Sequence, residues 1–102
     1  MVEIVKIEEK ISSKLGFRDS AEDLFHYLNT LPVGKIFIDF TGVEFISRSF
    51  AHEYLMQKNR TNKKIKNVNV PKNVKVMFDT VLKSIENPKK NKVNAKRVLA
   101  FS

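Results

Sequence analysis

A chain of 102 residues, of which 42% are hydrophobic, is long enough for one modest core, so we expect residues 1–102 to form a single domain. The absence of cysteine excludes disulfide bonds and thiolate metal sites, and no apolar run approaches the roughly 20 residues of a membrane span. The acidic N-terminus does not resemble a signal peptide, so we expect a cytoplasmic protein that does not associate with membranes.

The net charge of +8 is concentrated in the second half of the chain. Residues 1–57 hold six Lys/Arg and nine Asp/Glu, a balance of −3, whereas residues 58–102 hold thirteen and two, a balance of +11. Such asymmetry is typical of a polyanion-binding surface. A solvated surface rich in Lys and Asn explains it equally simply, and we favour that explanation because few aromatic or Arg residues are interspersed.

The first elements in chain order are a strand and a helix. Loose alternation of aliphatic and charged residues predicts a strand over residues 2–8, and residues 11–16 either extend it or form a return strand. Two pairs at the start of the helix have capping-box spacing, Asp19 with Glu22 and Ser20 with Asp23. The buried face of this helix is expected to consist of Ala21, Leu24, Phe25, Leu28 and Leu31.

The stretch from Lys35 to Asn59 organises the chain. An apolar β-branched and aromatic run predicts a buried strand that ends at Asp39. Thr41 and Gly42 form a turn, after which the chain returns to the core. At Ser47 the hydrophobic period changes to that of a helix. The sequence therefore predicts a strand, a loop and a helix, with polar groups gathered at the start of the helix.

A third strand and a third helix follow. Alternation predicts the strand over residues 65–70, and Pro71 suits the first turn of a helix because it has no amide hydrogen. The apolar face of that helix is Val74, Met77, Phe78, Val81, Leu82 and Ile85. Residues 89–92 are expected to form a basic turn, and residues 93–102 an edge strand or a short helix. The alternation of strands and helices predicts an α/β fold with parallel strands joined by helices.

Catalytic and metal-binding chemistry has little support in the sequence. His26 and His52 both fall within predicted helices and have no partner at catalytic spacing. Asp39 is better explained as a carboxylate that binds loop amides. No cluster of ligands has metal spacing, and the glycines are isolated, so we expect neither an enzyme nor a bound metal or cofactor.

The Ser47-Arg48-Ser49 stretch is the strongest candidate site. A serine hydroxyl at a helix start can accept a hydrogen bond from an otherwise unpaired amide, and plain capping is the simplest role for these serines. The same location also favours an anion, and a phosphate added there would bring a charge of about −1.5 to −2. We expect Ser47 to be the better cap, leaving the hydroxyl of Ser49 free.

The order and spacing of these pieces resemble the STAS-like domain family over roughly residues 12–85. The motif is hydrophobic-Asp-Phe-x-Gly-Val followed by Ile-Ser-x-Ser-Phe-Ala-x-Glu-Tyr-Leu, with support from Arg18–Leu24 and Val68–Pro71. The family is similar to the STAS domains of anti-sigma-factor antagonists, and this resemblance implies a mixed β-sheet packed against helices. In the antagonists a kinase phosphorylates a Ser at the start of the helix, and Ser49 falls on that position. Ser47 and Phe50 replace the Asp and Gly of the antagonist motif.

Two functions follow as hypotheses. The first is a non-enzymatic regulatory domain that docks a protein partner, such as a histidine-kinase-like ATPase, through the strand-to-helix junction. Its binding residues would be Asp39, Gly42, Ser47, Arg48 and Ser49. The second is binding of nucleic acid or another polyanion through the basic second half, with Lys63, Lys64, Lys66, Lys89, Lys90, Lys92, Lys96 and Arg97 as the patch.

Overall fold

The frame of the fold is a three-stranded parallel sheet. The computed structural model describes residues 1–86, which form β1 (Val2–Lys6), α1 (Ile7–Lys10), β2 (Lys14–Leu15), α2 (Arg18–Thr30), β3 (Lys35–Asp39), β4 (Phe45–Ile46), α3 (Arg48–Arg60), β5 (Lys64–Val68) and α4 (Lys72–Glu86). The strand order is β1-β3-β5, and β2 and β4 form a second, parallel pair. The predicted α/β class is confirmed. All pairings within residues 1–86 are parallel, so the mixed sheet implied by the family resemblance is not found there.

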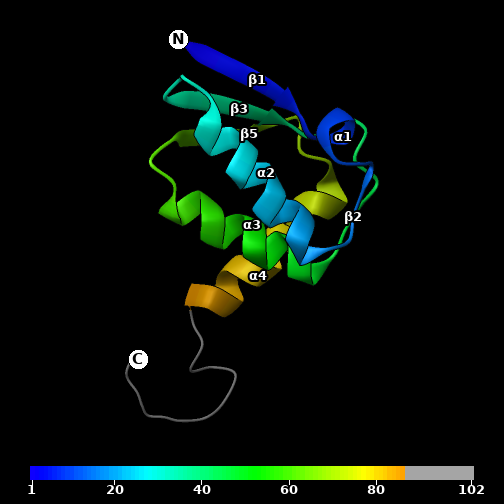
Figure 1. Ribbon diagram of the computed structural model, residues 1–102. Helices are drawn as coiled ribbons and strands as arrows, with labels where there is room; N and C mark the ends of the chain where they lie inside the picture. The colour runs from blue at the N-terminus through cyan, green and yellow to red at the C-terminus, as the bar shows by residue number, and fades with distance from the viewer. Residues whose placement is uncertain (87–102) are drawn as a thin grey trace, which may run out of the picture.

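The three long helices of the described chain pack side by side, with α3 between α2 and α4 (Figure 1). One face of the sheet contributes Val5, Ile36 and Ile38 to the buried core, which also contains residues of all three helices. Side chains alternate between the two faces of a strand, so the intervening residues point away from this core. The sheet therefore has an inner face covered by helices and an outer face that carries Val2, Ile4 and Phe37.

The core is built around Tyr54 of α3. Its ring is fully buried and contacts the rings of Phe25, Phe40, Phe50 and Phe78, with centroid separations of 5.3–6.2 Å. These rings come from α2, α3, α4 and the residue after β3, so one side chain joins the layers. Its hydroxyl donates a hydrogen bond to Oδ1 of Asn67 on β5, and burial raises the pKa of Tyr54 far above its usual value.

The first predicted strand is shorter than expected. It ends at Lys6, which pairs with Asp39, the last residue of β3. The chain then turns through α1, in which fully buried Ile7 accepts a backbone hydrogen bond from Ile11 at 2.8 Å. The predictions for residues 11–16 are both wrong, because β2 neither extends β1 nor returns along it and pairs with β4 instead. Local alternation could not reveal that distant partner.

The start of α2 also differs from the prediction. The helix begins at Arg18, which places Phe17 at the N-cap position with no side-chain capping bond. Asp19 therefore lies inside the first turn, and both predicted capping boxes are wrong. The buried face is confirmed for Ala21, Leu24, Phe25 and Leu28, while Leu31 is partly buried.

The predicted third strand and third helix are present as β5 and α4. The strand ends at Val68, two residues earlier than predicted, because Asn69 turns the chain with a φ of 54°. Pro71 directly precedes α4, and its carbonyl accepts from the amide of Lys75 at 2.9 Å. Leu82 was predicted on the apolar face and is exposed. The predictions for residues 89–92 and 93–102 lie outside the described residues.

Tyr54→Phe should lower the free energy of unfolding by about 1–3 kcal/mol, because the amide of Asn67 loses its partner in a partly buried location. The measurement is urea denaturation followed by circular dichroism. The double variant Tyr54→Phe/Asn67→Leu removes both polar partners and should recover part of this loss. A single variant as stable as the wild type would show that the hydroxyl contributes nothing to the fold.

Candidate functional site

The small β2-β4 sheet brings two helix starts to the same end of the molecule. Its register pairs Lys14 with Phe45 and Leu15 with Ile46. The amide of Ser47 continues the ladder by donating to the carbonyl of Leu15 at 2.8 Å. Both strands run in the same direction, and each is followed within three residues by a long helix, α2 or α3. The starts of these helices are therefore neighbours, although about thirty residues separate them in the sequence.

Ser47 connects these two helix starts. Its Oγ accepts a hydrogen bond from the amide of Phe50 at 3.0 Å, which confirms the predicted cap of α3. The same hydroxyl donates to the carbonyl of Gly16 at 3.0 Å, just before α2. Ser49 lies in the first turn of α3, is exposed, and its hydroxyl makes no hydrogen bond with any other group in residues 1–86. Ser47 therefore has a structural role, and Ser49 is accessible to solvent.

Two aromatic side chains that the sequence analysis did not select lie beside the capped helix start. Phe17 is 76% exposed and Phe45 is 49% exposed, and the Phe45 ring lies against Gly16. Arg48, the first residue of α3, is also exposed. We use the name junction surface for Phe17, Phe45, Arg48 and Ser49. The sequence could have predicted that Phe45 points outward, because Phe45 precedes the buried Ile46 and successive strand residues point to opposite faces.

Asp39 and Gly42 contact groups outside the junction surface. Oδ1 of Asp39 accepts from the amide and the hydroxyl of Thr41 at 2.9 and 2.6 Å, and from Nδ2 of Asn69 at 3.2 Å. Gly42 has a φ of 86°, and a Cβ there would overlap the carboxylate of Glu8. Within residues 1–86, no hydrogen bond or ion pair joins them to the junction surface. Asp39 and Gly42 thus make their contacts with the loops after β3 and β5 and with α1.

The environment of Asp39 favours its charged form. The hydroxyl of Thr41, followed by its amide, holds the pKa of Asp39 below its ordinary value, and Asn69 and the charge of Lys6 act in the same direction. The carboxylate thus holds the loop after β3 against the loop after β5. This is the structural role expected for it from the sequence.

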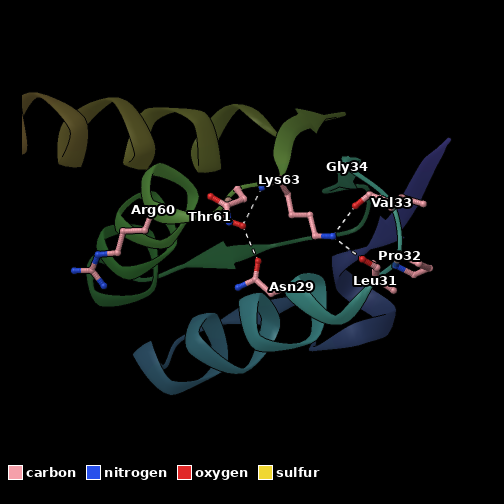
Figure 2. Close-up of a pocket in the computed structure, with 9 residues that line it drawn as sticks. Asn29, Leu31, Pro32, Val33, Gly34, Arg60, Thr61 and Lys63 are labelled. Atoms are coloured by element: carbon pink, nitrogen blue, oxygen red, sulfur yellow. Dashed lines mark hydrogen bonds between the residues drawn. The ribbon is translucent and has the colours of Figure 1, made fainter.

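Lys63 of the predicted polyanion patch also has a structural role. Its ammonium donates to the carbonyls of Leu31 and Val33 at 2.5 and 2.6 Å (Figure 2). Lys63 lines an open pocket of about 590 Å³ where α2 and α3 end. Its positive charge therefore binds carbonyls just after α2 that have no partner within the helix. Lys64 and Lys66 are exposed on β5. The other members of the patch, Lys89, Lys90, Lys92, Lys96 and Arg97, lie outside the described residues.

The two histidines lie on different helices of the described chain. His26 is exposed on α2. Nδ1 of His52 is buried on α3 and has no hydrogen-bond partner there. Across residues 1–86, no group of three or more His, Cys, Asp or Glu side chains is placed to hold a metal ion.

Comparisons with protein-family models, with curated proteins and with solved structures found no match for this chain.

Among residues 1–86, none of the helices combines the length and the apolar character needed to cross a membrane.

Ser47→Ala should lower the free energy of unfolding by about 0.5–2 kcal/mol, because one hydroxyl caps α3 and also bonds to Gly16. Ser49→Ala is the matched control: it removes an exposed hydroxyl from the same turn and should leave stability within about 0.5 kcal/mol of the wild type. Urea denaturation of both variants checks the assignment. Equal effects of the two substitutions would contradict it.

Asp39→Asn should reduce stability in a pH-dependent way. A carboxyl whose pKa is lowered by folding stabilises the protein above its ordinary pKa of 3.8, and this contribution is lost as the pH falls through the folded value. The stability difference between wild type and Asp39→Asn should therefore be largest near about pH 6 and shrink below about pH 4. Urea titrations across this range measure it, and a constant difference would exclude the charge as the cause.

Proposed function

We propose that this protein is a non-enzymatic, cytoplasmic regulatory domain that docks a protein partner through the junction surface. The observation that carries this proposal is the pair of exposed phenylalanines, Phe17 and Phe45, beside Arg48 and Ser49. Aromatic and Arg side chains are enriched at the energetic centres of protein interfaces, where they fill pockets of the partner. An apolar centre beside a cation and a hydroxyl thus suits a partner with an apolar pocket and an acidic rim.

The local structure would hold this surface in a fixed geometry. Ser47 holds the starts of α2 and α3 together, so little conformational entropy is lost when the side chains around it bind. The start of α2 has no side-chain cap, so an acidic group of a partner could accept hydrogen bonds from its amides. The first feature favours binding of any partner, and the second favours an acidic group on it.

The resemblance to STAS-like domains adds a form of regulation to the proposal. Ser49 occupies the position that a kinase phosphorylates in the anti-sigma-factor antagonists, and here it is exposed at the start of α3. A histidine-kinase-like ATPase is the partner class that the resemblance suggests. A phosphate on Ser49 would be compatible with the helix dipole, whereas its desolvation within an interface would weaken binding.

A photo-crosslinking amino acid placed at Phe17 of the full chain tests the docking surface in native lysate. We expect a discrete crosslinked product whose yield falls about tenfold or more in Arg48→Glu, as for loss of an interface Arg. Lys72→Glu is the matched control, because Lys72 is exposed, begins α4 and gives the same charge change at a helix start. The control should retain the product.

The switch is tested in the same assay by Ser49→Asp, with Ser49→Ala as the neutral comparison. The acidic variant should keep the melting temperature of the wild type and lose the crosslinked product. The alanine variant should keep both. Crosslinking that is unaffected by Arg48→Glu, or reduced equally by Lys72→Glu, would contradict the proposed surface.

A further inference from the structure

The outer face of the β1-β3-β5 sheet lies away from the junction surface and carries a second set of exposed side chains. Strand register places Ile4, Phe37 and Lys66 in one row across the sheet. The neighbouring row consists of Val2, Lys35 and Lys64. Val2 is 51% exposed and Ile4 is 61% exposed, so no helix of residues 1–86 covers this side. Parallel sheets are normally covered on both faces, which makes an open face unusual.

The chemistry of this outer face is apolar at the centre and basic around it. Phe37 is half-buried at the middle of the central strand, and the ammonium of Lys35 lies 5.4 Å from the centroid of its ring. Lys6, Lys64 and Lys66 are exposed on the same side, against a single carboxylate, Asp39. That carboxylate already bonds to Thr41 and Asn69. The face therefore presents free positive charge around an aromatic ring.

Charge decides between the possible occupants of this face. A second copy of the chain would bring lysines against lysines, so a symmetric face-to-face dimer would be repelled. A polyanion is complementary, and the chain as a whole carries a net charge of +8. A duplex would offer phosphates while its bases remain stacked on one another. A single strand offers phosphates together with free base faces.

We propose that the outer face of the β1-β3-β5 sheet binds single-stranded nucleic acid, with Phe37 as a stacking platform and Lys35, Lys64 and Lys66 as phosphate contacts. A base can stack on the ring of Phe37, while Val2 and Ile4 supply apolar contact to the adjacent nucleotide. Lys35 lies on the same strand as Phe37, and Lys64 and Lys66 lie on the neighbouring β5, so a backbone that passes along this side of the ring meets several positive charges. No base-specific donor is required, so sequence preference should be weak.

Fluorescence anisotropy of the full chain with a labelled oligo(dT), at about 50 and 200 mM salt, measures this binding. Affinity should fall with salt at a slope consistent with about three neutralised phosphates. Lys64→Glu/Lys66→Glu should weaken binding tenfold or more. Lys72→Glu/Lys83→Glu on α4 changes the charge equally, away from the sheet, and should have a smaller effect.

Phe37→Leu separates stacking from charge. It keeps an apolar side chain, so circular dichroism should show a folded protein, and it should weaken oligo(dT) binding about fivefold or more. Binding to a duplex of the same length should change little, because its bases are not free to stack. This difference between single strand and duplex is the result that a purely electrostatic surface would not produce.

Three results would overturn the proposal. The first is the absence of oligo(dT) binding at about 50 mM salt, where electrostatic binding is strongest. The second is an equal loss of oligo(dT) affinity in the sheet and α4 double variants. The third is an equal effect of Phe37→Leu on binding to single strand and to duplex. If the first result is accompanied by binding to phosphatidylserine vesicles, the face is assigned to a membrane surface. The crosslinking at Phe17 tests a different surface, so either proposal can fail alone.

Discussion

Parallel pairing of β3 with both of its neighbours is the constraint on which the rest of this structure depends. Parallel neighbours cannot be joined by a tight turn, so each connection must travel the length of the sheet, here through α2 and α3. α3 packs on both α2 and α4, and its Tyr54 contacts aromatic rings of both helices. The covered inner face and the open outer face both follow from this arrangement.

The small β2-β4 pair brings the starts of α2 and α3 together. It carries the chain beyond the carboxyl ends of the main strands before α2 and α3 begin. As a result, Asp39 remains with the loops at the main sheet, while Ser47 caps a helix next to Gly16. One feature of the sequence, a polar strand-to-helix junction, thereby serves two purposes. Its first half holds loops together, and its second half forms the capped start of α3, where Arg48 and Ser49 are exposed.

The two proposed surfaces have complementary physical requirements. The junction surface is small, aromatic and held by a hydrogen-bonded serine, which suits a specific protein contact. The outer face of the sheet is broader and its charge is spread over three strands, which suits a flexible polyanion. A domain with both could link a protein partner to a nucleic acid. Each surface is formed by side chains that the core does not need, so substitutions there should leave the fold intact.

Local patterns in the sequence determined the three long helices, the strands of the main sheet and the cap of α3. The buried strand that ends at Asp39, the apolar face of α2 and the change of period at Ser47 are each encoded by a short local stretch of sequence. Tertiary structure alone decided which distant segments meet. It paired β2 with β4, started α2 at Arg18 without a cap, and directed Lys63 to two carbonyls. It also exposed Phe17 and left one sheet face open, because burial depends on long-range packing that local periodicity does not contain.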